Sequence, residues 1–174
     1  MASTMQQAKF TGLTAILPAT SEARRQSYRR AYEHNRHRIY ALAFWMTDNE
    51  LVAEALMRHT FLRAFAAGVE PSADTIDRAL ITELRERMPL GALTLDVGLC
   101  TEVQNVRSNT LRVELECAVV QLPATERLIF LLHDVESYDH ARIGRYLGIS
   151  ENESRHGLHQ ARLRIRQLLA AMRS

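Results

Sequence analysis

A regularly spaced set of basic side chains near the C-terminus is the part of the sequence best suited to a binding task. The set recurs at i, i+4, i+7 and i+11, on one face of a helix, and consists of Arg155, His159, Arg162 and Arg166. Guanidinium groups bind phosphates and form bidentate hydrogen bonds with base edges. No Asp or Glu follows Glu153 in the chain. The pattern therefore indicates nucleic-acid binding, although an arginine-rich solvated helix has the same pattern.

Two predicted helices and a tight turn must position this face. A short helix is predicted up to about Leu147, with Ser137 or Asp139 as its N-cap, followed by a turn that contains Gly148. A helix–turn–helix of this kind lays its second helix in the major groove, with the N-terminal residues against base edges.

The last helix has the features that such a unit needs. Ser150 and Glu153 have the spacing of a capping box, which predicts a helix that runs to about Met172. An apolar stripe opposite the basic one consists of Leu158, Ala161, Ile165, Leu168 and Met172. Two features depart from this pattern: Ser154 falls on the apolar stripe, and Gly157 lies inside the helix.

The rest of the chain also has helical periodicity. The predicted helices span residues 28–46, about 49–68, 76–88, 111–122 and 123–132. A second capping-box pattern, Thr47 to Glu50, precedes the second of these helices. No segment has convincing strand alternation, so the expected fold is all-α, with two small helical domains joined by a linker. The expected divisions are an N-terminal arm (1–20), a helical domain (21–88), a linker (89–109) and a helix–turn–helix domain (110–174).

The charges of the chain are unevenly distributed, although its net charge is only +2. Residues 21–45 hold six arginines against two glutamates, residues 46–138 hold eight arginines against fifteen acidic residues, and residues 139–174 hold seven arginines against three. The six arginines of residues 21–45 could follow a nucleic-acid backbone, bind an acidic protein surface or form a solvated helix face. They are Arg24, Arg25, Arg29, Arg30, Arg36 and Arg38.

Several function classes find no support. No nucleophile elbow, phosphate-binding loop or dinucleotide fingerprint is present, so we expect neither an enzyme nor a cofactor. His133, Asp134, Asp139 and His140 are close in sequence but lack a metal-ligand spacing, so we expect no metal site. No apolar run is long enough to span a membrane, and two cysteines make no disulfide framework. We expect a cytoplasmic protein.

Residues 122–169 resemble the C-terminal domain, region 4, of extracytoplasmic-function (ECF) sigma factors. The matching positions are Leu122-Pro123, Glu126-Arg127, Phe130-Leu131, Ile143, Leu147-Gly148-Ile149-Ser150, Leu158, Ala161-Arg162-Leu163 and Leu168. Residues 40–65 are similar to region 2 of the same family, most clearly at Ala43, Asp48, Ala53-Glu54, Leu56 and Phe61-Leu62-Arg63-Ala64-Phe65.

The resemblance implies a bacterial transcription initiation factor that binds core RNA polymerase and directs it to specific promoters. In the family, region 2 binds the polymerase clamp and opens the promoter, and region 4 reads duplex DNA and touches the polymerase flap. The DNA contacts then fall to Arg155, His156, His159, Arg162 and Arg166, with Ser150 and the first-turn amides holding a phosphate. The polymerase contacts fall to Glu54, Arg58, His59 and Phe61. An anti-sigma factor is a further partner of this kind of protein.

Region 2 also departs from the family pattern. Ala55, Arg58 and His59 stand where the family is more acidic, and the predicted helix 76–88 has no aromatic side chain to stack on separated bases. The alternatives are a stand-alone helix–turn–helix regulator whose first half dimerises or senses a ligand, and a sigma-like interaction module. Neither alternative supports promoter melting.

Overall fold

A computed structural model describes residues 16–66, 71–95 and 111–172 of the chain, with side chains from Ser21 onward. These residues form helices and connecting turns without a strand, which confirms the all-α prediction. None of the helices within these ranges is long and apolar enough to cross a membrane. The same ranges contain no cluster of three or more His, Cys, Asp or Glu side chains arranged to hold a metal ion.

Three helices form the first group. They are α1 (Ile16–Thr47), α2 (Glu50–Ala66) and α3 (Ala73–Arg85), and α2 packs against both of the others. Their buried apolar faces meet in a core that includes Ile39, Leu56, Ile76, Leu80 and Leu84. The predicted stripe of the third helix is therefore confirmed at Ile76, Leu80 and Leu84.

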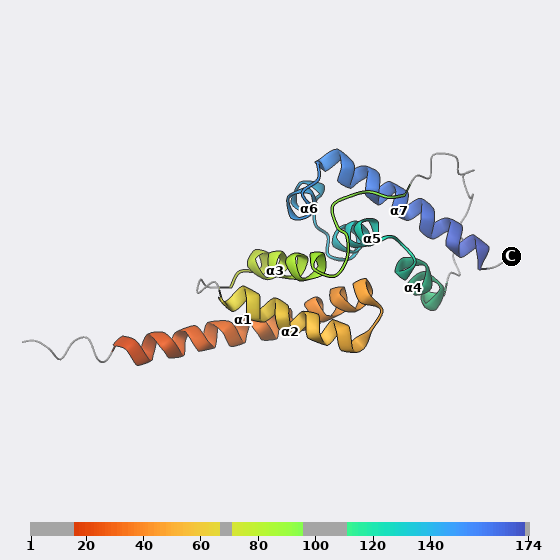
Figure 1. Cartoon of the computed structure of the whole chain (residues 1–174). Helices are drawn as coiled ribbons and strands as arrows, with labels where there is room; N and C mark the ends of the chain where they lie inside the picture. The colour runs from red at the N-terminus through yellow and green to blue at the C-terminus, as the bar shows by residue number, and fades with distance from the viewer. Residues whose placement is uncertain (1–15, 67–70, 96–110, 173–174) are drawn as a thin grey trace, which may run out of the picture.

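The remaining helices form a second group. It contains α4 (Arg112–Val120), α5 (Ala124–Phe130), the π-helical turn η1 (Leu131–Val135), α6 (His140–Leu147) and α7 (Glu151–Ala171). In Figure 1 the long α7 crosses the top of this group, α5 lies beneath it, and α1 to α3 form a layer below. The buried side chains Leu128, Ile129, Ile143, Leu147 and Leu158 fill the interior.

One expected boundary and one expected cap differ in the structure. The first helix begins at Ile16, twelve residues before the predicted start, so residues 16–20 of the expected arm are helical; residues 1–15 lie outside the described part. The side chain of Asn49, not Thr47, caps α2 by accepting a hydrogen bond from the Val52 amide at 3.0 Å. Thr47 instead donates to the Ala43 carbonyl within α1. The predicted capping box at this position is therefore wrong, although the helix begins where expected.

A buried carboxylate joins the two groups. Asp77 of α3, which is 3% exposed, accepts a hydrogen bond from Arg38 of α1 at 2.6 Å. Its other oxygen accepts hydrogen bonds from Tyr138 at 2.6 Å, Arg142 at 2.9 Å and Tyr146 at 3.4 Å, all in the second group. Burial, and to a lesser extent the hydrogen bond to Asp77, raises the pKa of Tyr138 to about 12. The phenol therefore keeps its proton and donates a hydrogen bond to Asp77. A buried charge needs several partners of this kind, and here they hold the helix groups together.

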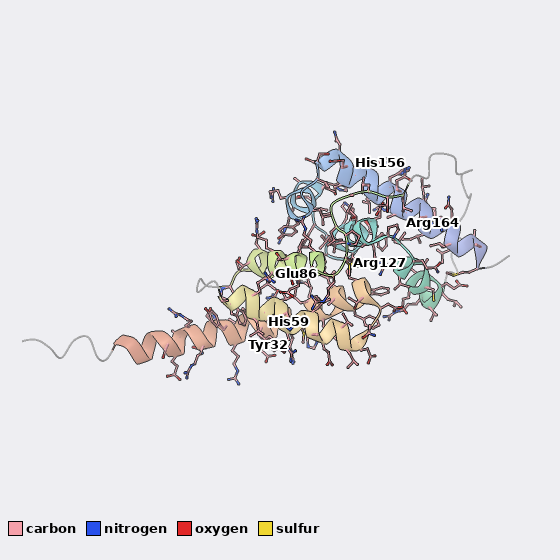
Figure 2. All side chains as sticks on the ribbon, in the orientation of Figure 1. Tyr32, His59, Glu86, Arg127, His156 and Arg164 are labelled. Atoms are coloured by element: carbon pink, nitrogen blue, oxygen red, sulfur yellow. The ribbon has the colours of Figure 1, made fainter. Side chains whose placement is uncertain are left out.

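Two neighbouring side chains of α5 add further connections. Arg127 donates to the carbonyls of Met46 at the end of α1 and of Leu122 at 3.2 and 2.8 Å, and Figure 2 shows it between the two groups. Glu126, fully buried, accepts hydrogen bonds from the amides of Thr94 and Leu95 at 2.6 and 2.7 Å. The first part of the expected linker is therefore fixed to α5, and residues 96–109 lie outside the described part.

Candidate nucleic-acid interface and helical groove

The turn between α6 and α7 has the local geometry that the sequence predicted. Asp139 caps α6 by accepting a hydrogen bond from the Arg142 amide at 2.6 Å. Gly148 ends α6 in the left-handed conformation, with φ of 72°, where a side chain would be strained. Ser150 accepts a hydrogen bond from the Glu153 amide at 3.1 Å, and Glu153 accepts one from the Ser150 amide at 2.7 Å. The capping box of the last helix is confirmed.

α7 has one buried face and one exposed basic face. Leu158, Ala161 and Ile165 are buried against the rest of the second group. The exposed face carries the predicted basic set together with His156, namely Arg155, His156, His159, Arg162 and Arg166. Figure 2 shows His156 on the outer side of α7, away from α1 to α3. These five side chains therefore form one accessible surface along α7.

The arginines of this face differ in their partners. Arg155 pairs with Glu151, one turn earlier in α7. Arg162 makes a bidentate contact with Asp134 of η1, at 3.0 and 2.6 Å, and this hydrogen bonding raises the pKa of Arg162. Arg166 makes no ion pair with any residue in the described ranges. Carboxylates therefore hold two of the three guanidinium groups, those of Arg155 and Arg162.

Ser150 has both of its donors occupied. Its amide and its hydroxyl each donate to Glu153 at 2.7 Å. Hydrogen bonds from the Ser150 hydroxyl and amide lower the pKa of Glu153, so the carboxylate stays ionised at this position. Ser150 therefore sets where α7 begins, and its amide and hydroxyl are not free to bind a phosphate.

Ser154, the polar residue on the apolar stripe, is satisfied by a histidine of α6. Its hydroxyl is buried and lies 3.0 Å from Nδ1 of His140. The His140 ring stacks on His133 of η1, with 4.5 Å between ring centroids. Burial lowers the pKa of His140, and the charges of His133 and Arg155 lower it further. The short helix and α7 thus share a polar contact beneath the basic face.

Close packing, which the sequence did not reveal, explains why position 157 is a glycine. It is buried, and a Cβ at this position would lie 2.7 Å from a methyl carbon of both Ile129 and Leu93. Leu93 belongs to the segment that Glu126 anchors. Glycine therefore allows α7 to approach α5 and this segment closely.

A groove lies between α1 and α2. It has a volume of about 640 Å³. Its walls come from α1 residues Tyr32, Arg36, His37 and Tyr40 and from α2 residues Leu51, Glu54, Ala55, Met57, Arg58, Phe61, Leu62 and Phe65. Phe61 is buried and meets the Tyr32 ring edge to face, with 4.8 Å between centroids. Figure 2 shows Tyr32 on the side of the molecule opposite His156.

Three of the four residues assigned to polymerase contact line this groove: Glu54, Arg58 and Phe61. His59 does not, because its ring faces α3 and lies 3.7 Å from a carboxylate oxygen of Glu83. Two further residues, Leu51 and Leu62, were not among the predicted contacts and are 78% and 62% exposed on the same face of α2. Their spacing with Glu54 and Arg58 on one helix face was the pattern that could have identified them.

Comparisons with known proteins agree with this architecture. Residues 112–165, from α4 into α7, match the family model described as Sigma-70, region 4. The chain is 27% identical over 173 residues to the ECF RNA polymerase sigma factor SigE of Mycolicibacterium smegmatis, covering 90% of this chain and 67% of that protein.

The fold has a counterpart among solved structures. The sigma factor RpoE from Bartonella quintana, solved in complex with the anti-sigma factor NepR, matches with a TM-score of 0.61 and 15% sequence identity. The match covers 83% of this chain and 98% of that one. The helix–turn–helix with its basic face, the region 4 match and the similarity to SigE agree with one another: residues 112–165 match the sigma-70 region 4 family, and the chain as a whole is similar to the ECF sigma factors of bacterial RNA polymerase.

Proposed function

We propose that this sigma factor binds core RNA polymerase through the α1–α2 groove and reads promoter DNA with the exposed face of α7. The observation that carries the proposal is the basic face of α7, in a helix–turn–helix that lies within the region 4 match. The chemistry is recognition, and no covalent step is involved. We assign residues 21–88 to the polymerase-binding domain, 89–109 to the linker and 110–174 to the DNA-binding domain.

The roles of the α7 side chains follow from their position along the helix. Arg155 and His156 lie in the first turns, which meet base edges when such a helix enters the major groove. We therefore assign sequence readout to these two residues. His159 and Arg162 continue the same face, and Arg166, farthest from the N-terminus of the helix, is assigned to a phosphate.

The groove has the composition of a protein-binding surface. Exposed leucines, Leu51 and Leu62, flank the charged pair Glu54 and Arg58, and aromatic side chains form its floor. Apolar and aromatic anchors with a polar rim are typical of interface centres. Because the groove and the α7 face lie on opposite sides, polymerase and DNA can be bound together (Figure 2).

Two further assignments follow from the family. We infer a cytoplasmic location, where core polymerase and promoters are found. An anti-sigma factor is a further partner, because the solved structure of RpoE contains one, and the exposed groove is a surface that such a protein could cover.

In vitro transcription with purified core polymerase tests the proposal. We expect the wild-type chain to bind core polymerase and to start transcription at promoters of its own regulon. Leu51→Asp introduces a charge into the exposed apolar rim and should abolish co-purification with core polymerase. Val113→Asp makes the same change at a comparably exposed position of α4, 66% against 78%, and should leave binding intact. Duplex binding without any polymerase binding would instead indicate a stand-alone regulator.

A further inference from the structure

The N-terminal part of α1 extends beyond the helices that it packs against. Near this part of α1 the ring of Tyr28 stacks on Phe65, with 4.6 Å between centroids. Its hydroxyl donates to the Phe65 carbonyl at 3.3 Å, close to the end of α2. Figure 1 shows the first turns of α1, in red, continuing past the end of α2.

This extension is strongly basic. Residues 21–30 hold four arginines against one glutamate, and all four arginines are exposed: Arg24, Arg25, Arg29 and Arg30. None of the four forms an ion pair within the described part of the chain, whereas Arg36 farther along α1 pairs with Glu33 at 3.2 Å. Among the residues that the structure describes, these four exposed guanidinium groups have no carboxylate within ion-pair distance.

The arginines occupy a defined geometry. Arg25 and Arg29 are one turn apart on the same face, and Arg36 continues this face at i+11 from Arg25. At 1.5 Å per residue the stripe is about 16 Å long. Like charges at i and i+4 repel each other, and an anionic partner would relieve this repulsion.

The chemistry of the extension favours a nucleic acid over a protein as that partner. Between Ser21 and Ser27 no large apolar side chain is present, and Tyr28 is occupied by Phe65. Protein interfaces need an apolar or aromatic centre, which this segment does not offer. Binding to a phosphate backbone needs only positive side chains that displace condensed counterions.

We propose that residues 24–30 of α1 bind the phosphate backbone of duplex DNA without regard to its sequence. This contact is separate from the α7 face and does not depend on the role proposed for α7. Its effect is to add affinity and salt dependence, while base recognition stays with α7.

The test measures the affinity of the full chain for a fluorescent 30-base-pair duplex of random sequence at several salt concentrations. Arg25→Gln/Arg29→Gln removes two charges and keeps good helix formers. The matched control, Arg78→Gln/Arg87→Gln, removes two exposed arginines in and just after α3, outside the DNA-binding domain. The logarithm of the binding constant falls as the logarithm of the salt concentration rises, and we expect this dependence to be less steep by about 2 in the first variant. Its affinity at 0.1 M salt should be about 60-fold weaker than that of the wild type. The control should behave as the wild type.

A wild-type slope in the Arg25→Gln/Arg29→Gln variant, with unchanged helix content by circular dichroism, would overturn the proposal. A photo-crosslinker at Gln26 gives a second readout in the complex with polymerase and promoter. Crosslinks to DNA support the proposal, and crosslinks only to a polymerase subunit overturn it in favour of an acidic protein surface. Arg166→Gln, measured in parallel, reports on α7 alone, so failure of the α7 assignment is seen separately.

Discussion

Asn in place of Asp77 is expected to destabilise the protein by about 3 kcal/mol. Each hydrogen bond to a charged group contributes about 1.5–3 kcal/mol, and breaking a buried ion pair costs about 3–5 kcal/mol. The side chains of Arg38 and Arg142 keep 22% and 28% of their exposure, so water compensates in part and the lower end applies. In a protein of this size the loss lowers the thermal midpoint by about 6–12 °C.

Urea denaturation followed by circular dichroism at 222 nm measures this loss. Asp74→Asn is the comparison variant: Asp74 lies on the same helix and accepts a hydrogen bond from Tyr146 at 2.8 Å, which Asn can still accept, but its side chain is 48% exposed in its pair with Arg78. Its loss should not exceed about 1 kcal/mol. If Asp77→Asn costs less than about 1 kcal/mol, or no more than the control, then the buried carboxylate does not hold the two helix groups together.

Three further predictions concern the second helix group. Arg155→Ala should reduce discrimination between promoter sequences by about 1–3 kcal/mol, whereas Arg166→Ala should weaken binding to all duplexes and lower the salt slope by about 1, as measured by fluorescence anisotropy. Asp134→Asn should strengthen duplex binding and steepen the salt slope, because it releases Arg162 from its bidentate carboxylate. Burial lowers the pKa of His140 below its ordinary value of 6.5. As the pH falls, this histidine is therefore protonated in the unfolded chain before it is protonated in the folded chain. The free energy of unfolding should fall as the pH drops below about 6.5.

Each of these predictions has a contradicting result. Equal losses on every sequence for both arginine variants would reduce Arg155 to a phosphate contact. Unchanged DNA affinity in Asp134→Asn would remove Arg162 from the interface. For the pH effect the control is His140→Asn, which should flatten the loss of stability below about pH 6.5; an equally steep loss in both proteins would assign the proton uptake to other groups.

Local features of the fold could be predicted well from the sequence. The caps at Asp139 and Ser150, the left-handed Gly148 and the apolar stripes of α3 and α7 depend on residues within one or two turns. The start of α1 could not be predicted, because residues 16–27 have no sustained apolar periodicity.

The residues of the candidate sites were predictable where helical spacing alone places them on one face. The basic face of α7 follows from helical spacing alone, and so do the groove residues Glu54 and Arg58. The contact between His59 and Glu83 was not predictable, since its partner lies on another helix.

Helical periodicity and capping are short-range properties, so the all-α chain, the capped helix–turn–helix and the face of basic residues follow from the order of the amino acids. Which of those basic side chains are already paired depends on how the helices pack in three dimensions. Asp134 and Arg162 are 28 positions apart, and Asp77 and Arg142 are 65 apart, yet both pairs are in contact. Such contacts depend on how helices dock, because burial requires each charge to find a partner wherever the chain brings one near.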